Sequence, residues 1–195
     1  VKGAEPGDIL VVDILDLGPF PDHEWGFTGI FEQENGGGFL TDHFPDAAKA
    51  IWDLDGVMTH SRHVEDVRFP GCAHPGIMGT APSHELLEEW NRREQELIDR
   101  GPDRETAVNH ETREEQPPLA LPPEPNEVLL GGMDEEDVPE AAEKAARTIP
   151  PRENAGNCDI KNLGRGSRVY IPVFVEGANF ITGDLHFSQG DGEIT

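Results

Sequence analysis

The chain has 195 residues, of which 39 are acidic and 15 are basic, so its formal net charge is −24, and 35% of the residues are hydrophobic. A surface this acidic repels phosphate backbones and anionic lipid headgroups, and no apolar run approaches the roughly 20 residues of a membrane-spanning helix. We therefore expect no nucleic-acid partner and no membrane. Two cysteines, Cys72 and Cys158, cannot build a disulfide framework. Reduced thiols and the charge together favour a cytoplasmic protein.

The first segment, residues 1–83, is predicted to be rich in β-strands and in loops that contain Gly and Pro. Residues 7–17 start with turn chemistry and continue with β-branched side chains, which favours a strand. Shorter strands are expected near residues 26–31 and 64–69. The Gly- and Pro-rich residues 71–82 predict a loop whose backbone N–H groups could stabilise an oxyanion, although the pattern also fits a plain connector.

The second segment, residues 84–150, is predicted to be an acidic insertion with a helix at each end and a Pro-rich stretch between them. Ser83 is a good N-cap, and the apolar side chains that follow it recur at helical spacing up to a stop signal after Arg100. A second helix is expected after Asp137. Residues 103–133 are charged and Pro-rich, which predicts a long surface excursion. The acidic run favours a solvated face, with cation binding as the alternative.

The third segment, residues 151–195, is predicted to be a β segment, with strands at residues 168–175 and 179–189. The turn at Gly190–Gly192 needs a second strand, which residues 193–195 hardly supply, and the chain begins without Met. We therefore expect one domain that is incomplete at both ends. Strands at both ends with helices in the middle predict a mainly β fold with α-helical insertions (α+β), built as β-sandwich or barrel-like sheets.

Asp184 and His186 form the sharpest local pattern. Because side chains alternate faces along a strand, Asp184, His186 and Ser188 would share one face. A carboxylate beside an imidazole can orient a general base or ligate a metal ion. The alternative is an ion pair at the surface.

A second polar group lies at residues 156–159. Gly156 lets the backbone come close to a ligand, and Asn157 and Asp159 could position an amide or a water molecule. An Asx-type turn is the simpler explanation of these residues. Cys158 could be a nucleophile whose pKa is lowered by Lys161, or it could be a small packing residue.

Two long motifs resemble the acetamidase/formamidase family. One reads Asn-Ala-Gly-Asn-Cys-Asp-Ile-Lys-Asn-Leu from Asn154, and the other reads Gly-Asp-Leu-His-Phe-Ser-Gln-Gly-Asp-Gly-Glu-Ile-Thr from Gly183. Residues 74–83 and the opening residues 1–8 are similar to the formamidase branch. Members are much longer, so the resemblance implies an internal portion of a longer chain. Ala155 stands where the pattern has Gly, and we expect it to exclude a positive φ at low cost.

The resemblance implies a mostly β homo-oligomer that hydrolyses formamide or a similarly short linear amide to the carboxylate and ammonia. The family's polar motif positions fall on Asn157, Asp159, Asp184, His186, Asp191 and Glu193, and we take Asp159, Asp184, His186 and Glu193 as the catalytic candidates. Asn157 and the backbone at Gly76, Gly79 and Thr80 are the substrate-binding candidates, which would contact the small amide. In this hypothesis Asp184 and His186 hold the attacking water or a divalent metal ion such as zinc, and Glu193 passes a proton to the leaving ammonia.

Two other functions stay open. The chain could be a non-catalytic oligomerisation or scaffold fragment, or an amidase that uses Cys158 as its nucleophile. The most informative observation is whether the four catalytic candidates converge around one cavity.

Overall fold

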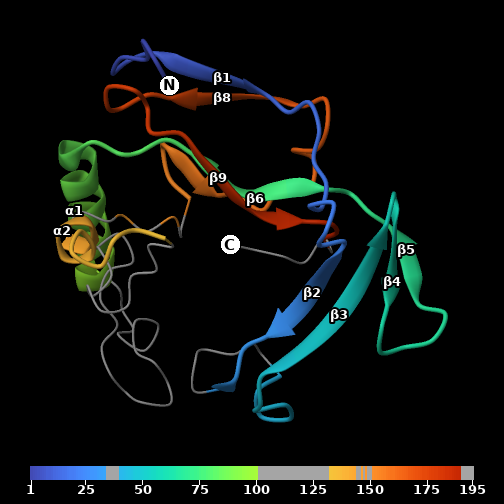
Figure 1. Ribbon diagram of the computed structural model, residues 1–195. Helices are drawn as coiled ribbons and strands as arrows, with labels where there is room; N and C mark the ends of the chain where they lie inside the picture. The colour runs from blue at the N-terminus through green and yellow to red at the C-terminus, as the bar shows by residue number, and fades with distance from the viewer. Residues whose placement is uncertain (34–39, 101–131, 144–145, 147, 149–150, 190–195) are drawn as a thin grey trace.

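The computed structural model describes residues 1–33, 40–100, 132–143, 146, 148 and 151–189 (Figure 1). These residues form three small antiparallel sheets and two helices. The predicted mainly β fold with α-helical insertions is therefore confirmed. In the ranges that the structure describes, no helix combines the length and the apolar character needed to cross a membrane.

Two of the three sheets join strands that are distant in the sequence, and the other sheet joins consecutive strands. One sheet pairs β1 (Ile9–Asp13) with β8 (Arg168–Pro172), so segments from opposite ends of the chain lie side by side. The second sheet has the order β2 (Trp25–Ile30), β3 (Ala48–Asp55), β4 (Met58–Ser61) and β5 (Arg68–Pro70). The third sheet places β6 (His74–Gly79) between β7 (Ala155–Asn157) and β9 (Ile181–His186).

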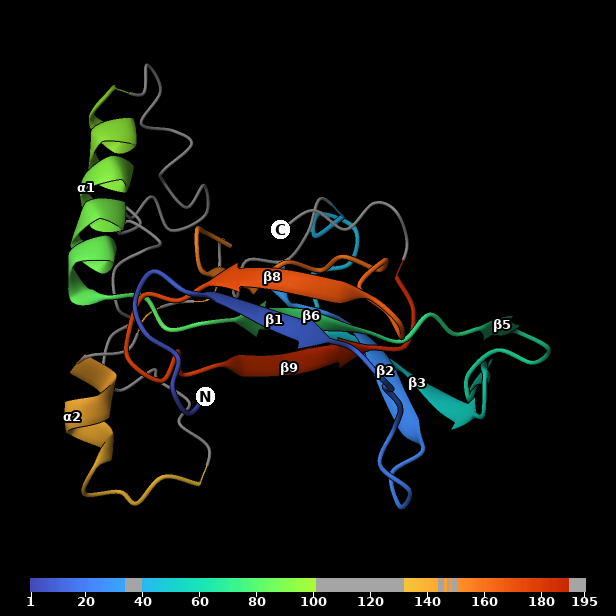
Figure 2. The same cartoon turned by 90° about the horizontal axis from the view of Figure 1, so that it is seen from above.

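Two of these sheets pack against each other and enclose the hydrophobic core. The β1–β8 sheet lies over β6 and β9 in both views (Figures 1 and 2). Ile14, Met78 and Ile171 form the buried cluster, with Met78 on β6 and Ile171 on β8. Burying a side chain of this size contributes about 1.5–3 kcal/mol. This packing supports the sandwich form of the prediction, and it fixes β6 and β9, which carry the polar motifs.

The long helix α1 (His84–Arg100) begins where the sequence predicts. Oγ of Ser83 accepts a hydrogen bond from a backbone N–H of the first turn at 3.2 Å, as an N-cap does. Trp90 is buried, its Nε1 donates to Oε2 of Glu153 at 2.7 Å, and the guanidinium of Arg152 lies 5.4 Å from the centre of its ring. These contacts anchor the helix to the chain just before β7.

The prediction of a loop over residues 71–82 is wrong. Residues His74–Gly79 form β6, the central strand of the third sheet, because partners on both sides satisfy its backbone groups. Pro75 lacks an N–H and would weaken a fully paired strand. It is tolerated because β7 pairs only with residues 77–79, which leaves Pro75 with a neighbour in β9 alone.

Strands β3 and β4 were not predicted from the sequence. They form a hairpin around Gly56, which has a φ of 59°. Because Asp55 pairs with Met58, the loop is Gly56-Val57, and a Gly at the first position of a two-residue loop is a hairpin signal. The strand expected near residues 64–69 is β5, which begins only at Arg68.

Several predictions fall wholly or partly outside the described residues. The second helix, α2 (Val138–Glu143), follows Asp137 as expected, but it ends at Glu143 and Ala145 is not described. The surface excursion expected at residues 103–133 lies outside the described residues, except for its last two positions. The turn at residues 190–192 also lies outside them.

Candidate active site

The third sheet brings Asp159, Asp184 and His186 together. One ligand atom from each of these residues lies within 4.8 Å of the other two. Nε2 of His186 is 3.3 Å from Oδ2 of Asp184 and 3.4 Å from Oδ1 of Asp159. Asn157 donates a hydrogen bond to Oδ2 of Asp159, which orients that carboxylate. Four of the polar positions singled out from the sequence therefore meet at one place.

Both carboxylates sit on backbone with an unusual conformation. Asp159 has a φ of 46° and Asp184 a φ of 47°, in the left-handed region that Asp tolerates better than most residues. The N–H groups of Cys158 and Asp159 both donate to the carbonyl of Gly76, at 2.8 and 3.1 Å. The β6–β9 register passes from Pro75↔Leu185 to Ile77↔Gly183 without a pair at the intervening position. The ladder is thus distorted where the carboxylates meet, a form of strain that is frequent at functional sites.

Gly76 lies in close contact with the carboxylates of Asp159 and Asp184. A β-carbon built on it would be 2.7 Å from Oδ1 of Asp159 and 2.7 Å from Oδ2 of Asp184. The strand can therefore carry only a glycine at this position if both carboxylates are to stay where they are. Contact between Gly76 and a substrate remains a prediction.

Two other predicted substrate-binding residues lie apart from the cluster. Thr80 is buried, and its hydroxyl donates to the carbonyl of Pro172 at 2.8 Å. A β-carbon on Gly79 would be 2.7 Å from the carbonyl oxygen of Asn154. Neither residue lines the cavity described below, and their substrate-binding roles stay predictions. Glu193 lies outside the described residues, so its predicted role is untested.

The prediction about Ala155 is wrong. Its φ is 66°, although it carries a side chain. The N–H groups of Ala155 and Arg152 each donate to the other residue's carbonyl at 2.9 Å, which closes a tight turn just before Asn157. The turn imposes the left-handed conformation, and the reciprocal hydrogen bonds offset its cost of about 1–2 kcal/mol.

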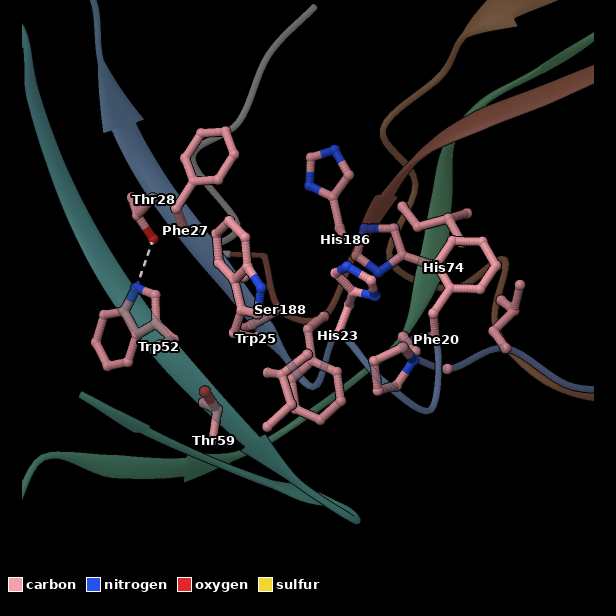
Figure 3. Close-up of a pocket in the computed structure, with 18 of the residues that line it drawn as sticks. Phe20, His23, Trp25, Phe27, Thr28, Trp52, Thr59, His74, His186 and Ser188 are labelled. Atoms are coloured by element: carbon pink, nitrogen blue, oxygen red, sulfur yellow. Dashed lines mark hydrogen bonds between the residues drawn. The ribbon is translucent and has the colours of Figure 1, made fainter. Parts of the chain in front are cut away.

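A cavity of about 560 Å³ opens beside the cluster, and Asp184, His186 and Ser188 all contribute to its wall. Figure 3 shows Trp25, Phe27 and Trp52 along one side of it and His186 on the other. Its aromatic lining residues come from both sides of the opening: Phe20, Trp25, Phe27, Trp52, Phe69 and Phe187. The four-stranded sheet therefore faces the polar cluster across an apolar space.

The volume of this cavity, about 560 Å³, falls within the range typical of pockets for drug-sized ligands. Strands β2 and β3 contribute their aromatic side chains to it from a separate sheet. Phe20 and Phe27 remain largely exposed there.

We predicted no role for the side chain of His74, which is fully buried beside the same cavity. Its ring stacks on that of His186, with 5.1 Å between the ring centres and an interplanar angle of 26°. Only the pairing of β6 with β9 brings the two residues together. The loop predicted for residues 71–82 would leave His74 without this partner.

Comparison with known proteins shows the family of the chain. A model of the acetamidase/formamidase family matches residues 1–195. The chain belongs to the acetamidase/formamidase family. It is 56% identical to a formamidase of Methylophilus methylotrophus and 56% identical to an acetamidase of Mycolicibacterium smegmatis, in each case over 100% of this chain. These matches cover 45% and 47% of the two relatives, so the chain spans under half of their length.

Solved structures support the fold. The γ-lactamase from Delftia acidovorans superposes with a TM-score of 0.77 at 52% sequence identity, covering 98% of this chain and 44% of that chain. An acetamidase from Bacillus halodurans, at 23% identity and a TM-score of 0.57, shares the fold. Nearly the whole of this chain therefore shares its fold with part of each of these two proteins.

Within this family member, Cys158 is poorly suited to be a nucleophile. Burial raises the pKa of its thiol, and the neighbouring charge of Asp159 raises it further. This is the opposite of the lowering that Lys161 was expected to produce. Because the thiolate is the reactive form, a raised pKa disfavours attack by sulfur at neutral pH.

The acidic cluster is better suited to acid–base or metal chemistry. The side chain of Asp159 is only 6% exposed, that of His186 is 19% exposed and that of Asp184 is 52% exposed, so the cluster runs from the interior to the cavity. Two carboxylates and one imidazole form a donor set that Zn²⁺ and similar divalent ions accept. Such an ion would also offset the repulsion between the carboxylates.

Proposed function

We propose that the whole protein hydrolyses formamide, or a similarly short linear amide, to the carboxylate and ammonia. The observation that carries this proposal is the convergence of Asp159, Asp184 and His186 at the wall of one cavity. Membership of the acetamidase/formamidase family supports amide hydrolysis as the reaction class. The names formamidase, acetamidase and γ-lactamase belong to the relatives, and the choice of formamide for this protein is our proposal.

In the proposed mechanism, His186 and the carboxylates activate a water molecule. Nε2 of His186 lies between Asp159 and Asp184 and can donate to both carboxylates, while the more exposed carboxylate of Asp184 can take a proton from water that enters from the cavity. The oxygen of that water attacks the amide carbon, the C–N bond breaks, and the nitrogen leaves as ammonia after it receives a proton. We assign that proton transfer to Glu193 on the basis of the family motif.

The same residues could hold a divalent metal ion. Asp184 and His186, together with Asp159, would ligate it, and zinc suits this donor set. A bound ion would lower the pKa of water and polarise the amide carbonyl. The role of this chain's residues is then to hold the ion, while the hydrogen bond from Asn157 keeps Asp159 oriented.

The experiment that tests the proposal measures ammonia release from formamide and acetamide by the whole protein. His186→Ala and Asp184→Asn should each lower turnover by roughly 10²-fold or more while the protein stays folded. Asp53→Asn is the matched control, because Asp53 pairs with Arg62 at the surface of the second sheet, where its loss should leave turnover unchanged.

Full turnover by a folded His186→Ala protein would remove His186 from the site. A wild-type whole protein with no amide turnover would favour the scaffold alternative. The homo-oligomeric assembly and the cytoplasmic location stay predictions.

A further inference from the structure

His74 is a buried imidazole to which the proposed mechanism gives no task. It has no exposed surface, and it lies directly opposite His186 in the β6–β9 register. The two rings stack at 5.1 Å and 26°. His74 therefore packs against one face of the His186 ring, and His186 contributes to the wall of the cavity.

The hydrogen bond of His74 fixes its tautomer and the rotation of its ring. Nδ1 lies 2.6 Å from the backbone carbonyl oxygen of Cys72. Because a carbonyl only accepts, Nδ1 carries the proton and Nε2 carries the lone pair. Nε2 is buried and has no hydrogen-bond partner among the described residues. A Phe ring at position 74 could stack on His186 without burying an unpaired acceptor. What distinguishes an imidazole from Phe here is therefore its hydrogen bond to the carbonyl of Cys72.

Cys72 also connects this arrangement back to His186. The N–H of Cys72 donates to the carbonyl of Phe187 at 2.6 Å, and Phe187 follows His186 in the chain. The backbone of Cys72 is therefore hydrogen-bonded both to the His74 ring and to the residue that follows β9. The His74 ring in turn stacks on His186. The imidazole of His186 is thus held through its backbone and through its ring face.

We propose that His74 is a positioning residue that holds the His186 imidazole between Asp159 and Asp184. This inference rests on the proposed function, because positioning matters only if Nε2 of His186 takes part in the reaction. Without the His74 ring, His186 can rotate toward the cavity, and the distances of 3.3 and 3.4 Å to the two carboxylates are lost. Turnover should then fall while substrate binding changes little.

Three variants of the whole protein separate the ring from the hydrogen bond. His74→Phe keeps a flat ring, His74→Asn keeps a donor for the carbonyl of Cys72, and His74→Ala keeps neither. We expect kcat for formamide to fall by roughly tenfold or more in the Asn and Ala variants. The Phe variant should retain several-fold more activity than either, and KM should stay within about twofold in all three. Equal losses in the Phe and Ala variants would overturn the proposal, and so would a raised KM with an unchanged kcat.

A second measurement does not depend on turnover. In protein labelled with ¹⁵N-histidine, the ring protons of His186 should show the ring-current shift of a stacked partner, and His74 should show the Nδ1–H tautomer. The His186 shift should persist in His74→Phe and vanish in His74→Asn. If the wild-type protein turns over no amide, the proposed function fails while this test of the stacking still stands. An unchanged His186 spectrum in His74→Asn would overturn the positioning role itself.

Discussion

A β-carbon on Gly76 would lie 2.7 Å from Oδ2 of Asp184, closer than such contacts occur in proteins. Its other near neighbours would be Oδ1 of Asp159 and the carbonyl oxygen of Asp184, each also at 2.7 Å. Backbone and carboxylate oxygens at this distance cannot all move aside without displacing β9 or the turn after β7. The arrangement of the two carboxylates therefore depends on a glycine in β6.

Gly76→Ala should separate the carboxylates and lower turnover by roughly 10²-fold, since a displacement of about 1 Å at a reacting group has this effect. Overpacking should also destabilise the fold by about 1–3 kcal/mol. Steady-state kinetics and urea unfolding of the whole protein measure both effects. Gly183→Ala is the matched control, because a β-carbon there meets nothing within 4 Å. Equal activity in the two variants would show that the carboxylate arrangement is not needed.

Cys158→Ala should leave amide turnover unchanged, because the raised pKa of this thiol keeps it protonated near neutral pH. Alkylation followed by mass spectrometry should label the exposed Cys72 first. The direction of the pKa shift also sets a pH dependence. The contribution of Cys158 to stability is present below the pKa of the unfolded thiol and is lost as the pH rises through the folded pKa. Loss of turnover in a folded Cys158→Ala protein would restore the thiol mechanism.

Acidification should loosen helix α1. The pKa of Glu153 is lowered by the hydrogen bond that its carboxylate accepts from Arg93, and further by the one that it accepts from Trp90. Its contribution to stability is therefore present above the unfolded pKa of about 4.3 and lost as the pH falls through the folded value. Because the pair is partly exposed, the effect is at most about 1 kcal/mol.

Urea unfolding of wild type and Glu153→Gln between pH 7 and pH 3 measures this contribution. The variant should lose stability at pH 7 and show a smaller decrease on acidification. Trp90→Phe is a companion variant, since it removes the indole donor and leaves the pair with Arg93. Identical pH profiles of Glu153→Gln and wild type would rule out Glu153 as the titrating group.

A metal ion in the cluster should be measurable without an activity assay. If the whole protein is purified with a divalent ion, Asp184→Asn and His186→Ala should each reduce the metal content per chain, as measured by atomic absorption. Chelation should lower turnover and thermal stability together, and zinc should restore both. A fully active protein with no metal would instead assign the water activation to His186 and the carboxylates alone.

The predictions that held were those in which a local pattern decides the structure. Ser83 caps its helix because the side chain and the first-turn N–H groups are neighbours in sequence. The spacing of Asp184 and His186 correctly placed their side chains together, since both lie on one strand. The approach of Asp159 to the same point was suggested by family motifs and could not have been derived from spacing.

What the sequence could not provide depends on pairing between distant strands. β6 contains Gly and Pro and has no clear alternation, so only its partners β7 and β9 make it a strand. The stacking of His74 on His186 and the place of Gly76 beneath two carboxylates follow from that pairing. The aromatic wall of the cavity likewise required knowledge of how separate sheets face each other.

The pairing of β1 with β8 also has a consequence for how the protein is made. Arg168 and Asp13, whose side chains meet across these strands, are separated by 155 residues. At the roughly 5–20 residues per second of protein synthesis, β1 leaves the ribosome about 8 to 30 s before its partner exists. During that interval Ile9 and Val11 lack the β8 strand that pairs with them in the folded chain. We expect chaperones that bind extended apolar segments to contact these residues until β8 has been made.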